Sequence, residues 1–218
     1  MNKLILCLTM VSISLVVWAQ QNNNLLAQTP EEILGKMGEV MDVGPEVGVA
    51  LTTDMKIPIL GGFSTRVYTL GEKSRMVVKV KGKEIVTWVD GTTTYTYEAE
   101  DNKITIEDWK EGQGSESNGN LKMAENITDG YDVKLQNETE KYWEFLCTRR
   151  KDNQDKDAPK KMTVSVWKDS YKLRALTASV KGITITMRNV SFGVKDPDVT
   201  FDISNYKDAK IVDKRGKK

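Results

Sequence analysis

From Val47 to Phe192 the apolar residues recur at every second position, and this alternation constrains the fold more than any other feature of the chain. A period of two is typical of β-strands that bury one face. Short turns such as Gly71-Glu72, Gly82-Lys83 and Asp90-Gly91 separate several of the runs, at the spacing of antiparallel hairpins. The expected strands are 47–53, 63–70, 75–80, 85–89, 93–98, 103–107, 133–138, 142–148, 161–167, 173–180 and 183–192.

So many consecutive strands are difficult to keep in one flat sheet, because twist accumulates and sheets beyond roughly ten strands curl or split. We therefore predict a mainly β fold with helices, of the α+β type. In it, a curved antiparallel sheet forms an unclosed half-barrel that is lidded by one or more helices. Two charged stretches, 110–120 and 149–160, interrupt the alternation and are expected to be exposed loops.

A helix is expected to begin at Pro30. Thr29 can cap it, proline fits the first helical position, and Glu32 completes a capping box. Apolar residues follow at helical spacing and form one stripe. We interpret this helix as the lid, with a stripe made of Ile33, Leu34, Met37, Val40 and Met41. A weaker stripe at 121–129 predicts a short second helix.

The N-terminus has the pattern of a secretory signal peptide. Lys3 provides a positive start, residues 4–17 are apolar and uncharged, and small residues precede a cleavage site after Ala19. We expect residues 1–19 to be removed during secretion and residues 20–28, rich in Asn and Gln, to form a disordered leader. The remainder, 29–218, is then expected to form a single domain.

The reactive side chains argue against several classes of function. The chain contains no histidine, which removes the usual general base and the usual zinc ligand. Cys7 lies in the signal peptide, so Cys147 is the one thiol left, and its apolar strand indicates a core residue. We therefore expect no metal, no cofactor and no enzymatic activity. A hydrolase with paired carboxylates is the weaker alternative.

The charge balance argues against a nucleic-acid partner. The chain has 32 Lys and Arg residues, of which Lys3 belongs to the signal peptide, against 31 Asp and Glu residues. Such a balance gives no basic surface for nucleic acid or for an anionic membrane.

The apolar faces of the strands allow two interpretations. In runs such as Met162, Val164 and Val166, apolar residues alternate with Thr and Ser. Two sheets of a sandwich would bury such faces against each other, whereas a half-barrel with few helices to cover it would leave some of them lining a cavity. The scarcity of helices favours the cavity, but the periodicity alone leaves both alternatives open.

Several stretches resemble a known family. Residues 71–97 contain SRMVVKV, IVTWVDG and TTTYTY: a strand with an arginine, an apolar strand with an Asp-Gly turn, and an aromatic-x-Tyr strand. MTVSVWKDSYKLRAL and VTFDISNYKDAKIVDKR follow nearer the C-terminus. In this order they resemble the LolA-like family of periplasmic carriers of outer-membrane lipoproteins. The chain departs from the family pattern at Met76, where a proline is frequent, in residues 42–62, and in the additional loop at 149–160.

The resemblance implies a fold and a function. The fold is an unclosed antiparallel barrel lidded by helices, and its apolar interior accepts the acyl chains of lipoproteins. Arg75 would be a latch that donates hydrogen bonds to the lid of the empty protein. The protein would be a periplasmic monomer that carries acylated lipoproteins or other lipid from an inner-membrane donor to an outer-membrane acceptor. The cavity would be lined by Trp88, Tyr95, Tyr97, Met162, Val164, Val166, Ile183, Ile185 and Met187.

Other interpretations remain open at this stage. The same fold can be a periplasmic sensor or interaction module with a filled core, which binds a protein or another lipid. A hydrolase acting on cell-wall polymers is the weakest of the alternatives. Arg75 could also be an ordinary exposed arginine beside a turn.

Overall fold

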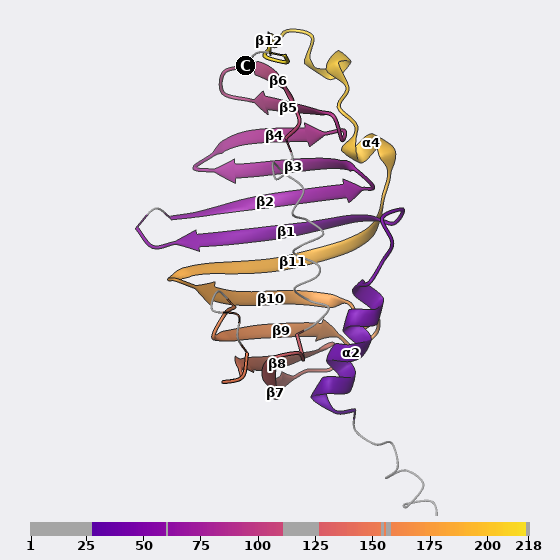
Figure 1. Cartoon of the computed structure of the whole chain (residues 1–218), viewed down its shortest axis with the longest axis vertical. Helices are drawn as coiled ribbons and strands as arrows, with labels where there is room; N and C mark the ends of the chain where they lie inside the picture. Colours follow the sequence, from indigo (N-terminus) through magenta and orange to yellow (C-terminus); the bar gives the residue numbers. More distant parts are fainter. Residues whose placement is uncertain (1–27, 60, 111–126, 154, 156–157, 217–218) are drawn as a thin grey trace, which may run out of the picture.

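A single sheet of twelve strands makes up most of the fold (Figure 1). The computed structural model describes residues 28–59, 61–110, 127–153, 155 and 158–216. The strands neighbour one another in the order β12-β6-β5-β4-β3-β2-β1-β11-β10-β9-β8-β7. All neighbouring pairs are antiparallel except β12 with β6, and the two edge strands, β12 and β7, do not pair with each other. The predicted unclosed antiparallel sheet is thus confirmed.

The strands predicted from the alternation are all present. Three of them, β5, β9 and β10, have the predicted bounds, and the others differ by a few residues at their ends. The strands are β1 Gly48–Ile57, β2 Gly61–Leu70, β3 Lys73–Val80, β4 Lys83–Val89, β5 Thr93–Glu98, β6 Lys103–Asp108, β7 Tyr131–Glu138, β8 Tyr142–Arg149, β9 Lys161–Trp167, β10 Leu173–Val180, β11 Ile183–Val194 and β12 Lys210–Asp213.

Helix α2 (Pro30–Met41) begins as its sequence predicts. The backbone N–H of Glu32 donates to Thr29 Oγ1 (3.2 Å), and the backbone N–H of Thr29 donates to Glu32 Oε2 (2.8 Å), which together form the capping box. The helix lies beside the lower strands in Figure 1 and contacts β7 and β9.

The structure describes only the last residue of the predicted leader and the last part of the predicted second helix. Gln28 was predicted to be in a disordered leader, but its side chain accepts a hydrogen bond from the Tyr171 hydroxyl (2.8 Å). The signal peptide and the rest of the leader lie outside the described residues. Most of the predicted helix at 121–129 also does, and its described end is part of a turn rather than a helix.

The register of the strands defines two faces of the sheet. Residues that lie opposite each other in neighbouring strands share a face, and successive residues of one strand alternate between faces. One row of such partners extends across eight strands, from β8 to β4. It consists of Phe145, Val164, Leu176, Met187, Thr53, Thr65, Val78 and Ile85. We call this side the α2 face.

The α2 face carries the main hydrophobic core. Under α2, the buried side chains come from the helix, from β1 and β7–β11, and from Ile127 in the turn before β7. Val164, Val166 and Phe145 are fully enclosed (0 % exposed). The complete cluster of buried residues is Ile33, Leu34, Met37, Met41, Val49, Leu51, Ile127, Tyr131, Phe145, Cys147, Met162, Val164, Val166, Leu173, Leu176, Ala178 and Met187.

Part of the opposite side of the sheet, over β2 to β5, is covered by the C-terminal segment. Residues 195–213, which we call the strap, run from β11 to β12 at the upper edge of the sheet (yellow in Figure 1). The strap contains α4 (Asp196–Val199), the 3-10 turn η1 (Ile203–Tyr206) and β12, none of which was predicted. Its start is held by an ion pair between Lys73 Nζ and Asp196 Oδ1 (2.5 Å). We call the side that it covers the strap face.

Candidate functional site

The predicted cavity residues do not lie on one surface. Trp88 follows Ile85 by three positions in β4, so the two side chains point to opposite sides of the sheet. Trp88 lies opposite Tyr95, and Tyr97 is two positions further along β5, so all three rings are on the strap face. The predicted single cavity is therefore wrong. The other predicted cavity residues come from β9 and β11, and they all lie on the α2 face. They are Met162, Val164, Val166, Ile183, Ile185 and Met187.

On the strap face, the three rings pack against two rings of the strap. Phe201 stacks on Tyr95 with centroids 4.4 Å apart and lies 5.3 Å from Trp88. Tyr206 packs against Tyr97 at 4.6 Å. Burial raises the pKa of the Tyr206 hydroxyl, with a smaller opposing effect from Arg75. The three rings that were predicted to line the cavity therefore form a second packed cluster, which Phe201 and Tyr206 of the strap complete.

Removing the Phe201 ring of the strap should lower the stability of the fold measurably. Phe201→Ala deletes the stack on Tyr95 and is expected to lower the free energy of unfolding by about 2 kcal/mol. Ile203→Ala is the matched control, because Ile203 lies in the same strap but is 48 % exposed, and it should change stability by less than about 0.5 kcal/mol. Urea denaturation measures both. Equal effects would show that the strap does not pack on the sheet in solution.

Arg75 does not latch the helix. It lies opposite Trp88 and therefore projects on the strap face, whereas α2 packs on the other face. Its guanidinium lies over the rings of Tyr68 and Trp88, at 5.6 Å from each centroid, and its Nε is buried without a hydrogen-bond partner in the described structure. The predicted latch from Arg75 to the lid helix is therefore wrong. The alternative of an ordinary exposed arginine does not fit the buried Nε either.

The predicted lid stripe is packed into the core. Ile33, Leu34, Met37 and Met41 are at most 3 % exposed, and Val40 is half-buried. The four buried side chains share one buried cluster with Met162, Val164, Val166 and Met187 of the sheet. Ile183 and Ile185 lie on the same face but are only half-buried. The helix therefore covers a filled interior over most of its length.

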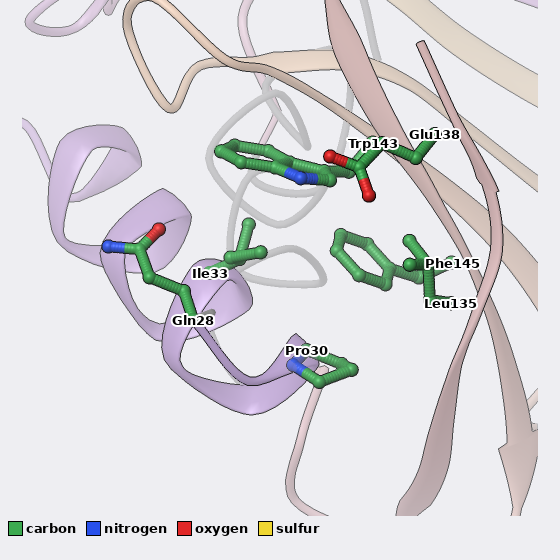
Figure 2. Close-up of a pocket in the computed structure, with 7 residues that line it drawn as sticks. All are labelled: Gln28, Pro30, Ile33, Leu135, Glu138, Trp143 and Phe145. Atoms are coloured by element: carbon green, nitrogen blue, oxygen red, sulfur yellow. The ribbon is translucent and has the colours of Figure 1, made fainter. Parts of the chain in front are cut away.

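An opening remains at the N-terminal end of α2. A pocket of about 290 Å³ separates the start of the helix from the β7–β8 hairpin. Figure 2 shows Pro30 and Ile33 from the helix facing Leu135, Trp143 and Phe145 from the strands. Ile33 and Phe145 also belong to the core cluster, so the pocket opens directly onto the buried interior. The lining residues are Gln28, Pro30, Ile33, Leu135, Glu138, Trp143 and Phe145.

The charge at this pocket is confined to one paired carboxylate. Lys168 Nζ donates to Glu138 Oε1 at 2.5 Å, and this bond lowers the pKa of Glu138. The same ammonium lies over the Trp143 ring, 5.1 Å from its centroid. Because Glu138 is neutralised by Lys168, the pocket offers mainly aliphatic and aromatic surface to a ligand.

Sequence reasoning missed most of this pocket, although one signal was available. Trp143, Phe145 and Cys147 occupy alternate positions of β8 and so share the α2 face. This alternation marks the strand that forms the pocket wall. Which helix end would face it could not be read from the sequence, because that depends on how α2 crosses the sheet.

The remaining side chains offer little chemistry. Burial raises the pKa of Cys147 to about 12, which supports the prediction of a core residue rather than a nucleophile. Within the described ranges, no group of three or more Cys, Asp or Glu side chains could hold a metal ion. No helix in the described part of the chain is long and apolar enough to cross a bilayer.

Comparison with known proteins gives matches at the level of structure only. No protein-family model matches the chain. No curated protein matches it either. A LolA superfamily protein from Nitrosomonas europaea is similar over 81 % of this chain and 99 % of its own, with 14 % identity and a TM-score of 0.31. LolA-like proteins are thus among the structural neighbours.

Two further structural neighbours are a protein named LprF and a complex of two proteins, MucA and MucB. LprF from Mycobacterium bovis is similar over 77 % of this chain and 95 % of its own, with 12 % identity and a TM-score of 0.46. The MucA/MucB complex of Pseudomonas aeruginosa matches 78 % of this chain but only 60 % of its own, with 12 % identity and a TM-score of 0.40. Similarities this distant do not extend to function.

Proposed function

We propose that the chain is a non-catalytic periplasmic carrier that binds an acyl chain of a lipoprotein, or of another lipid, in the pocket at the N-terminal end of α2. The observation that supports this most is the pocket itself. It is apolar, it opens to the surface, and it is continuous with the core through Ile33 and Phe145. Ligand sites commonly combine such an apolar lining with a few polar groups at the rim.

The size of the pocket limits how much of an acyl chain could bind. A volume of about 290 Å³ lies just below the roughly 300–1,000 Å³ of small-molecule sites, so the pocket accepts only the end of a long acyl chain. The rest of the chain would enter if the helix shifted away from the sheet. Methionines on both sides of that interface suit such a change, since their flexible side chains repack readily. These are Met37, Met41, Met162 and Met187.

The signal peptide predicted at residues 1–19 supports a role in the periplasm. A secreted chain with an acyl-binding pocket would move lipoproteins between an inner-membrane donor and an outer-membrane acceptor. A single domain over residues 29–218, as the sequence predicts, would be compatible with action as a monomer.

A charge at the pocket wall tests the proposal. Leu135 lines the pocket and is 47 % exposed, so Leu135→Glu should leave the fold intact while weakening the binding of a fluorescent fatty acid by about tenfold. Ile211→Glu is the matched control, because Ile211 is an equally exposed (48 %) residue of the opposite edge strand. Equilibrium titration followed by fluorescence measures both variants.

The result also separates the carrier from a second candidate, a protein-docking module. That alternative is favoured by the filled core under most of α2, which leaves no room for a whole acyl chain. If the unmodified protein binds no fatty-acid probe, and organic extracts of the purified protein contain no acylated species, the carrier proposal is overturned. Equal loss of binding in Leu135→Glu and Ile211→Glu would place the acyl site elsewhere.

A further inference from the structure

A second pocket lies where two neighbouring strands bulge. In β10, Arg174 is an extra residue, since Leu173 lies opposite Val166 and Ala175 opposite Ser165. In β11, Asn189 and Val190 together face one residue of β1, and Asn189 has a φ of 56°. Bulges redirect side chains out of the regular pleat and occur frequently beside functional sites. The pocket between them measures about 240 Å³.

The lining of this pocket is positive and partly aromatic. It contains Arg174, Arg188, Asn189 and Trp167, with no Asp or Glu among the residues that line it. Arg188 Nε donates to Asp54 Oδ2 at 2.5 Å, and this hydrogen bond lowers the pKa of Asp54. The Asp54 carboxylate therefore offsets the charge of Arg188, and the pocket keeps the charge of Arg174.

Arg174 is held in place without an anionic partner. Its guanidinium lies 4.2 Å from the centroid of Tyr142 and 5.4 Å from that of Trp167, in the corner made by two perpendicular rings. It forms no ion pair within the described residues. These cation–π contacts hold the guanidinium against the rings and occupy none of its N–H groups, which can bind an anion. Such a planar fork matches the oxygens of a phosphate group.

We propose that this pocket binds a phosphate group, with Arg174 as its main ligand. Arg188 and the Asn189 amide supply further donors from the adjoining bulge, and Trp167 with Leu173 gives an apolar wall for the group esterified to the phosphate. The phosphate could belong to a soluble molecule or to an anionic lipid headgroup. The site lies on the strap-face side of Ala175 and Arg188 and does not depend on acyl binding at α2.

Two probes distinguish the sources of the phosphate. The full mature chain is titrated with inorganic phosphate while the indole N–H signal of Trp167, assigned with Trp167→Phe, is followed by NMR. In parallel, the protein is sedimented with vesicles of phosphatidylglycerol and phosphatidylcholine, or of phosphatidylcholine alone. Arg174→Gln should weaken binding by about tenfold or more, since a hydrogen-bonded charge is lost. Ala175→Glu, which places a carboxylate at the same rim, should do the same if Arg174→Gln fails to fold.

Arg66→Gln is the matched control. Arg66 belongs to the same row of the sheet as Arg188 and also stacks on a ring, Tyr68 at 5.2 Å, but it does not line the pocket. A shift of the Trp167 signal by phosphate that survives in Arg66→Gln and is lost in Arg174→Gln assigns the site to a soluble phosphate. If the protein sediments with the vesicles that contain phosphatidylglycerol but not with those of phosphatidylcholine alone, and if this binding is lost in Arg174→Gln, the site is assigned to an anionic lipid headgroup. No response to either probe, or equal loss in Arg66→Gln, overturns the proposal.

Discussion

Replacing Val164 by Glu is expected to abolish cooperative folding, whereas Ile185→Glu should leave a folded protein. Val164 is fully buried (0 % exposed) in the core under α2. An unpaired carboxylate there would cost several kcal/mol, comparable with the total stability of about 5–15 kcal/mol of a domain. Ile185 lies on the same face but is half-buried, so water can reach a carboxylate introduced at that position. Thermal melts followed by circular dichroism measure the difference.

Val164→Ala provides the control for size. It removes two methyl groups without adding charge, so it should lower stability only moderately and keep a cooperative transition. If Val164→Glu also melts cooperatively near the temperature of the unmodified protein, water reaches the interior beneath α2. That outcome would favour the apolar cavity that the family resemblance implied over the filled core seen beneath α2 in the described residues.

Alternation and turns were sufficient to predict eleven of the twelve strands, β1 to β11, because each signal lies within a few neighbouring residues. The hairpin at Asp90-Gly91 is an example: Asp90 Oδ1 accepts hydrogen bonds from the backbone N–H groups of Thr92 and Thr93, and Gly91 has a φ of +93°. Helix α2 is a second example, since its capping box and stripe are local. The open sheet with a covering helix could therefore be anticipated.

The division of side chains between the two faces could not be anticipated in the same way. Within β4, the odd spacing of Ile85 and Trp88 already separates them. Relating either residue to Val164, however, requires the long-range pairing of β1 with β11, which contains register shifts. The strap was missed for a similar reason. β12 is too short to show alternation, and Phe201 reaches Trp88 only through the tertiary fold.

The double substitution Met37→Ser with Met41→Ser is expected to unfold the protein. Both side chains are buried (0 % and 1 % exposed) at the interface between α2 and the sheet. Truncating a buried methionine costs about 2–5 kcal/mol, and an enclosed hydroxyl without a partner adds to this. Together the two changes approach the whole stability of a domain. Urea denaturation followed by tryptophan fluorescence should show loss of the folded baseline.

The same experiment decides whether α2 is a separable lid. Glu39→Ser with Val40→Ser is the matched control, since it introduces two serines into the same helix at an exposed and a half-buried position. Its loss of stability should therefore be much smaller. A separable lid gives the opposite pattern: the double methionine variant would stay folded and bind a fatty-acid probe more tightly, because only the closure over the sheet had been weakened. In that case the packed arrangement of α2 would be one state of an opening equilibrium rather than a requirement of the fold.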